Sequence, residues 1–107
     1  MPHTAEPLPD ATSDGGDAAE RRAASGRNRT IALWAAVKMG LNPESSELYA
    51  QAVENFHAER STEEDVIRKI YGDLIASNIQ VRESEVRTKA AEFLAQAREA
   101  QKSDSKS

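Results

Sequence analysis

Residues 61–78 read STEEDVIRKIYGDLIASN, and this stretch carries the clearest folding signal in the 107-residue chain. Its large apolar residues recur at steps of three and four, which is the spacing of one face of an α-helix. These residues are Val66, Ile67, Ile70, Tyr71, Leu74 and Ile75. The stretch therefore predicts an amphipathic helix over about residues 63–77, with an apolar face wide enough to be buried.

Both ends of this helix carry boundary signals. Ser61 with Glu64, or Thr62 with Asp65, has the spacing of a capping box, in which side chains satisfy the free backbone N–H groups of the first turn. Acidic residues in that turn also face the positive end of the helix dipole. Asn78 fits a C-terminal stop, because asparagine tolerates the left-handed conformation that ends many helices.

A second helix is predicted over about residues 43–59. Asn42 is a good N-cap, and Pro43 fits the first helical position, where its missing N–H is not needed. The apolar side chains form two neighbouring rows, one of Leu48, Ala52 and Phe56 and one of Tyr49 and Val53. Together the rows give a stripe that we expect to be buried.

Two more helices are predicted, at about residues 27–39 and 83–101. The first has one row with Ile31, Trp34, Ala35 and Lys38 and another with Leu33 and Val37. Gly40 ends it, since glycine readily adopts the left-handed conformation of a C-terminal cap. The last helix is expected to turn inward Val86, Ala90, Phe93, Leu94 and Ala97. Ile79 and Val81, in the loop before it, could cover one end of the bundle.

These elements predict an all-α protein, a four-helix bundle in which short loops make neighbouring helices mostly antiparallel. Residues 1–26 are predicted to form a disordered or weakly helical tail, disordered over residues 1–16. Asp17 and Glu20 have the spacing of a capping box before an alanine-rich stretch, which could be a frayed extension of the first helix. The tail has five acidic residues against two arginines, no aromatic residue, and three of the four prolines. A segment of this kind buries too little apolar surface to offset its ordering entropy. Residues 102–107 are predicted to be disordered for the same reason.

Composition excludes several classes of protein. The net charge of -4 argues against a nucleic-acid binder, which needs a basic surface. The chain has no cysteine, so it has no disulfide or thiolate site. It also has no apolar run of about 18 residues and no basic-then-apolar start, so we expect no membrane insertion and no secretion.

Catalytic and metal sites are not predicted. His57 follows Glu54 at the Glu-x-x-His spacing of di-iron helical bundles, but the second such pair that those sites need is missing. We therefore expect His57 to be a surface or interface residue. No activated nucleophile and no phosphate-binding glycine loop is visible, so the protein is expected not to be an enzyme.

Two features remain as candidates for binding a partner. Arg21, Arg22, Arg27 and Arg29, here called the basic cluster, lie close together in an acidic protein. They form either a solvated helix start or a contact with an acidic partner or a phosphate. The single tryptophan, Trp34, is either a core residue or an interface anchor.

Residues 27–101 resemble the zeta subunit of bacterial F-type ATP synthases, whose fold is a four-helix bundle. The order and spacing of many short matches carry the resemblance. They are Arg27-Asn28-Arg29, Leu33-Trp34-Ala35-Ala36, Lys38, Gly40-Leu41, Tyr49-Ala50, Val53, Glu64-Asp65-Val66, Arg68-Lys69, Asp73-Leu74, Val86-Arg87, Lys89 and Leu94-Ala95-Gln96-Ala97-Arg98-Glu99. Arg82 stands where the family usually has a serine N-cap, which weakens that cap; Ser84 could shift the helix start.

The resemblance implies a regulatory subunit that binds the catalytic head of the synthase and restrains ATP hydrolysis. The family's inhibitory part is an N-terminal segment that enters a catalytic interface as a helix. In this chain that region, residues 1–26, has no phenylalanine, three prolines and a Gly15-Gly16 pair, which would obstruct a long helix. The alternative is a diverged, non-inhibitory helical adaptor that binds another partner or binds the synthase silently.

The resemblance also sets expectations for ligands and location. It implies no cofactor beyond weak binding of adenine nucleotide, for which the basic cluster is the candidate place. We expect a monomer in the cytoplasm, peripheral to the inner membrane where it binds the synthase.

Overall fold

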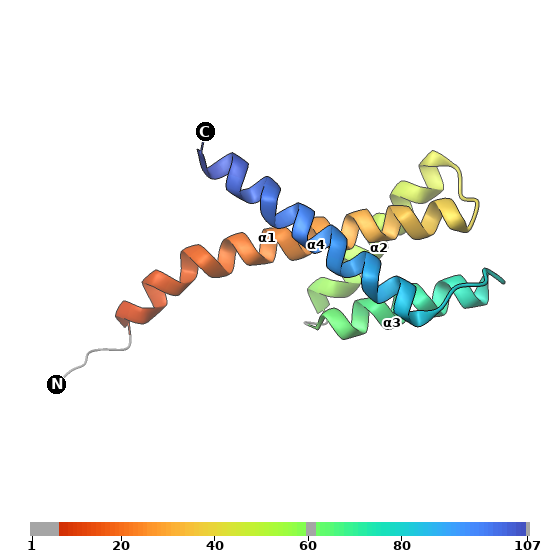
Figure 1. The fold of residues 1–107 in the computed structure, drawn as a ribbon, viewed down its shortest axis with the longest axis horizontal. Coiled ribbons are helices and arrows are strands. Elements are labelled where there is room, and N and C mark those ends of the chain that lie inside the picture. Colours follow the sequence, from red (N-terminus) through yellow and green to blue (C-terminus); the bar gives the residue numbers. More distant parts are fainter. Residues whose placement is uncertain (1–6, 60–61, 107) are drawn as a thin grey trace.

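The computed structural model describes residues 7–59 and 62–106, and the side chains of residues 18–56 and 62–102. Four helices follow in order: α1 (Pro7–Lys38), α2 (Pro43–Glu59), α3 (Glu63–Ala76) and α4 (Glu83–Lys106). Helix α1 packs most extensively against α2 and α4, and both run antiparallel to it (Figure 1). The predicted all-α four-helix bundle is confirmed, and the described ranges contain no strand.

The N-terminal caps of α2 and α3 follow the predicted chemistry. The Asn42 side chain accepts a hydrogen bond from the Ser45 N–H at 2.7 Å, directly before Pro43. Of the two candidate caps of α3, the structure uses Thr62, whose hydroxyl accepts from the Asp65 N–H at 3.1 Å. Each cap satisfies a backbone donor that the first helical turn leaves free.

The C-terminal ends of α1 and α3 share one geometry. Gly40 has a φ of 78° and Asn78 a φ of 64°, both in the left-handed region. In each case the next residue donates back across the turn, Leu41 to the Ala36 carbonyl at 3.0 Å and Ile79 to the Leu74 carbonyl at 2.9 Å. This is the Schellman motif, so both predicted stops are confirmed.

The helix that begins after Arg82 starts at Glu83, without the shift that Ser84 could have caused. Two backbone N–H groups, those of Glu85 and Val86, donate to the Arg82 carbonyl at 3.0 and 3.3 Å. Acidic Glu83 and Glu85 lie in the first turn, where they offset the positive end of the helix dipole.

The core lies where all four helices meet and is built from small and medium apolar side chains. Its buried members are Ile31, Ala32, Ala35, Ala50, Val53, Val66, Ile67, Ile70, Leu74, Val86 and Ala90. Alanines from α1, α2 and α4 let the helix backbones approach closely, while Ile70 and Leu74 of α3 fill the centre. Ile79 and Val81 pack against this core from the loop, as predicted.

Four predicted inward positions face solvent instead: Ala52 is exposed, and so are three larger residues. Leu48 is 61% exposed, Val37 is 75% exposed and Ile75 is 46% exposed. Helix α2 lies on α1 and α3 with the row of Tyr49 and Val53 inward. Of the other row, Leu48 and Ala52 face outward, and Phe56 is partly buried against the core. Two adjacent apolar rows look equivalent in the sequence, and the packing partners decide between them.

The outer boundaries of the bundle differ from those predicted. Helix α1 begins at Pro7 rather than near residue 27, and α4 continues to Lys106 rather than ending near residue 101. Residues 18–26 are therefore a packed part of α1, because they are rich in alanine and meet α4, as Ala23 at 1% exposure shows. The rest of the predicted tail, residues 1–6 and the side chains of residues 7–17, lies outside the described part.

The prolines of this segment do not interrupt the helix. Pro7 is the first residue of α1, and Pro9 lies two positions later. The first four N–H groups of a helix have no internal acceptor, so neither ring removes a hydrogen bond there. Gly15 and Gly16 lie inside α1, where each lowers helix propensity by about 1 kcal/mol relative to alanine.

Candidate functional site

The candidate region is the N-terminal half of α1, together with the part of α4 that packs on it. Figure 1 shows these two segments leaving the bundle at the same end and diverging from each other. The first turns of α1 extend away from the other helices, while Glu20, Arg22 and Gly26 contact α4. We call residues 7–26 of α1 the arm.

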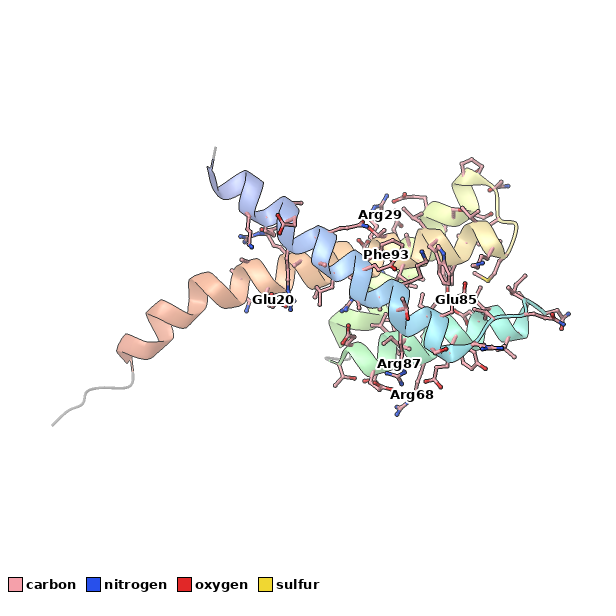
Figure 2. All side chains as sticks on the ribbon, viewed as in Figure 1. Glu20, Arg29, Arg68, Glu85, Arg87 and Phe93 are labelled. Carbon is pink, nitrogen blue, oxygen red and sulfur yellow. The ribbon has the colours of Figure 1, made fainter. Side chains whose placement is uncertain are left out.

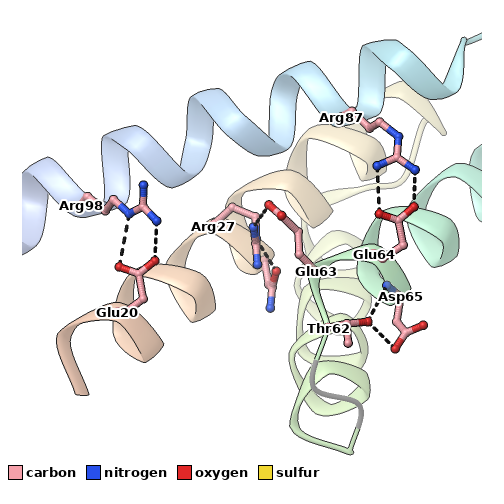
Figure 3. A network of polar contacts seen from close by, with 9 residues as sticks. Glu20, Arg27, Thr62, Glu63, Glu64, Asp65, Arg87 and Arg98 are labelled. Carbon is pink, nitrogen blue, oxygen red and sulfur yellow. Dashed lines mark hydrogen bonds and ion pairs between the residues drawn. The ribbon is translucent and has the colours of Figure 1, made fainter. Parts of the chain in front are cut away.

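A bidentate ion pair ties the arm to α4. The Arg98 guanidinium donates to both carboxylate oxygens of Glu20, at 3.2 and 2.6 Å (Figure 3). The hydrogen bond from Arg98 lowers the pKa of Glu20, and the same bond raises the pKa of Arg98. Both side chains remain about half exposed, at 53% and 54%, so water competes with this contact.

Further contacts extend the seam between the arm and α4. The Arg22 Nε donates to the Gln101 side chain at 3.0 Å. Gly26 faces Ala97, and a Cβ placed on Gly26 would lie 3.7 Å from the Ala97 Cβ. Beside them runs a shallow groove of about 310 Å³, and Phe93 lies in its wall.

Arg27 is the deepest charge of the region. Its side chain is only 3% exposed and donates to Glu63 at 2.5 Å and to the Asn28 side-chain oxygen at 2.6 Å. Burial lowers the pKa of Arg27, and the neighbouring Glu63 carboxylate opposes that shift. Asn28 is fully buried, and its Nδ2 has no hydrogen-bond partner among the described residues. Arg27 thus joins α1 to the start of α3.

Arg29 faces a different neighbour. It forms a bidentate pair with Glu47 of α2, at 2.9 and 2.5 Å. The bond to Glu47 raises the pKa of Arg29, and the bond from Arg29 lowers the pKa of Glu47. Figure 2 shows Arg29 close to the α2 side of the bundle, away from Glu20.

The four arginines of the basic cluster therefore do not form one patch. Arg27 pairs with α3 and Arg29 with α2, while Arg22 reaches α4. Arg21 and Arg22 are exposed. Although these arginines lie close together in the sequence, their side chains point to different sides of α1, because successive positions of an α-helix point in different directions.

Trp34 forms part of the bundle wall. It is partly buried and packs against the core. The Lys38 ammonium lies 5.1 Å from the centre of its ring, in a cation–π contact, and reaches Glu85 of α4 at 3.9 Å. The indole thus joins the core while keeping some exposure.

Several contacts of this region were not predicted from the sequence. The two ion pairs near the arm are Glu20 with Arg98 and Arg27 with Glu63. Their partners lie 78 and 36 residues apart in the sequence, respectively. No local spacing signals such pairs. The alanines around Gly26 were the available hint, since small residues permit a close helix approach.

The described residues form neither a metal site nor a membrane-spanning helix. Among the described side chains, no group of three or more His, Asp or Glu residues could hold a metal ion. The side chain of His57 lies outside the described residues, so its predicted surface position stays a prediction. None of the helices, over the residues described, has the length and apolar character that crossing a membrane requires.

Comparison with known proteins identifies the family. A family model described as ATPase inhibitor subunit zeta matches residues 16–100. No curated protein and no solved structure matches the chain. The match begins within the arm, eleven positions before the resemblance noted from the sequence, and it includes Glu20 and Arg98 of the seam. The family's name describes a regulatory subunit of an ATPase. Because the match spans most of its residues, the chain belongs to the ATPase inhibitor subunit zeta family.

Proposed function

We propose that the protein binds the catalytic head of an F-type ATP synthase through the arm and restrains ATP hydrolysis. The observation that carries the proposal is the family match, which includes residues 16–26 as well as the bundle. Those residues belong to the part of α1 that leaves the bundle (Figure 1). The family match thus includes residues 16–26 of the arm, and one side of this part of the arm carries exposed side chains such as Arg21.

The structure gives a physical reason why the arm suits this role. Residues 7–38 are one continuous helix, so the bundle carries the arm in helical form. A segment that is already helical loses less conformational entropy on binding than a disordered one. Pro7 and Pro9 support this form, since they occupy only its first turn.

The test is ATP hydrolysis by the detached catalytic head of the synthase from the same cell. Adding the purified protein should lower the turnover in a saturable way. Arg21→Glu should weaken inhibition, since Arg21 is an exposed charge of the arm. Arg68→Glu is the matched control, because Arg68 is 68% exposed on α3 and should leave inhibition unchanged. Unchanged turnover at saturating wild-type protein would contradict the proposal.

One observation favours the alternative, a helical adaptor that binds without inhibiting. Among residues 1–26 the only large apolar residues are Met1 and Leu8. Tight interfaces usually depend on a few large buried anchors, and the arm offers few. Capture of the catalytic head by the immobilised protein separates the two functions. Capture with undiminished hydrolysis would establish the adaptor, whereas capture with inhibition supports the proposal above.

A further inference from the structure

The arm does not present all of its faces to solvent. Positions 20, 23 and 27 share one side of α1, and Ala23 is only 1% exposed there. Residues 97–101 of α4 lie along this part of the arm, with Ala97 on Gly26, Arg98 on Glu20 and Gln101 on Arg22. A partner that surrounds the arm with a cleft would meet α4 on this side first.

The contacts that hold α4 on the arm are weak ones. The pair of Glu20 and Arg98 is half exposed, and the bond from Arg22 to Gln101 also lies at the surface. Exposed pairs of this kind shift an equilibrium by only about two- to fivefold. The apolar part of the seam is small, since it consists of Ala23 and of Gly26 on Ala97. We therefore expect the seam above Arg27 to open without unfolding of the bundle.

The contact at the base of the arm is of a different kind. The Arg27 side chain is 3% exposed and paired with Glu63, and the core residue Ile31 follows one turn later. Opening this contact would expose a buried charge network. The boundary between a releasable segment and a fixed one thus falls between Gly26 and Arg27.

We propose that residues 97–101 of α4, held by Arg98 on Glu20, are a clasp that covers one face of the arm and competes with the partner for it. This inference rests on the proposed function for the identity of the partner, a cleft that takes up a helix. The apparent affinity of the arm is then reduced by the fraction of molecules in which the clasp is closed. Releasing the clasp should strengthen inhibition.

The experiment exchanges the two charges of the clasp in the full-length protein. Arg98→Glu should place two carboxylates opposite each other and open the seam. Amide hydrogen exchange over residues 19–26 should then accelerate by about two- to fivefold. The concentration for half-maximal inhibition of ATP hydrolysis should fall by the same factor. Glu20→Arg with Arg98→Glu restores opposite charges and should return both values toward wild type.

A matched control addresses net charge. Lys102→Glu makes the same change next to the clasp, but Lys102 is 73% exposed and pairs with Glu99 of its own helix. It should leave exchange over residues 19–26 unchanged. The double exchange also tests direct contact: if Glu20 itself bound the partner, the double variant would inhibit as poorly as Glu20→Arg, and the clasp would be refuted.

The outcomes separate this inference from the proposed function. Unchanged exchange in Arg98→Glu refutes the clasp, whatever the protein binds. Faster exchange with unchanged or weaker inhibition refutes the competition while the proposed function stands. Absence of inhibition by both wild type and Arg98→Glu at saturation refutes the proposed function, and the competition falls with it. Faster exchange together with stronger inhibition supports the clasp.

Discussion

Removing the Glu63 carboxylate should destabilise the bundle, because it leaves the buried Arg27 guanidinium without its counter-charge. Arg27 is 3% exposed, and Glu63 accepts from it at 2.5 Å. In the variant Glu63→Ala the guanidinium would keep only the 2.6 Å bond to the Asn28 oxygen. Burial lowers the pKa of Arg27 and the Glu63 carboxylate opposes that shift, so Glu63 offsets part of the cost of burying this charge.

The size of the loss in stability follows from how exposed the Arg27 and Glu63 side chains are. A hydrogen bond to a charged group contributes about 1.5–3 kcal/mol, and losing one partner of a buried pair costs the desolvation of the other. Because the Glu63 side chain is 48% exposed, water can reach the gap that it leaves. The lower end of this energy range therefore applies. We expect a loss of about 1.5 kcal/mol, which lowers the melting temperature of a domain this size by about 6–12 °C. Glu63→Gln keeps an acceptor and should lose about half as much.

Urea unfolding followed by circular dichroism at 222 nm measures the free energy of unfolding directly. Glu92→Ala is the control, since Glu92 accepts from Lys89 on an exposed face of α4 and should change stability by less than about 0.5 kcal/mol. If Glu63→Ala and Glu92→Ala cost the same, the buried pair would not be what fixes the base of the arm.

Three further predictions concern glycines and acid. Gly72→Ala and Gly26→Ala should each stabilise the fold by up to about 1 kcal/mol in urea unfolding, because a Cβ meets nothing within 4 Å at Gly72 and only Ala97, at 3.7 Å, at Gly26. A loss of stability in Gly26→Ala would mean that α1 and α4 leave no room for a methyl group there. Gly40→Ala should destabilise by about 1 kcal/mol or more in the same assay, since its φ of 78° is strained for alanine, and equal stability would argue against the left-handed cap. The free energy of unfolding should hold down to about pH 5 and fall as the pH drops below about 4.5. Arginine partners lower the folded-state pKa of three carboxyls. The stabilisation from these carboxyls is present above their unfolded-state pKa and is lost as they become protonated. These carboxyls are Glu20, Glu47 and Glu64, which pair with Arg98, Arg29 and Arg87. Replacing them by glutamine should flatten the acid limb of a pH series of unfolding curves, and an unchanged limb would count against these ion pairs.

Local signals predicted the bundle well. Each capping residue acts within four residues of its own helix end, so its role can be predicted from its neighbours in the sequence. These residues are Asn42, Thr62, Gly40 and Asn78. The choice of the buried row in α2 was not local, because it depends on which side of the helix meets α1 and α3. Leu48 faces solvent for that reason.

The candidate site was harder to predict, since tertiary pairing defines it. Arg27 and Arg29 lie two positions apart in the sequence, yet one enters the interior toward α3 and the other pairs with α2. The segment before Arg27 looked like a tail because apolar residues are scarce in it. Alanine supplies helix propensity and close approach without hydrophobic bulk, so Ala23 is buried where composition predicted exposure.

The same chemistry serves two roles along α1, and burial separates them. Arg98 with Glu20 and Arg27 with Glu63 are both arginine–carboxylate pairs between distant helices (Figure 3). The first is half exposed on both sides, so salt screens it and water replaces it at little cost. In the second pair the guanidinium is buried, so breaking the pair leaves a buried charge without its partner. Raising the salt concentration should therefore accelerate amide exchange at residues 19–26 well before it does so at residues 30–36. Equal acceleration of both segments would mean that α1 opens as one unit and that Arg27 marks no boundary.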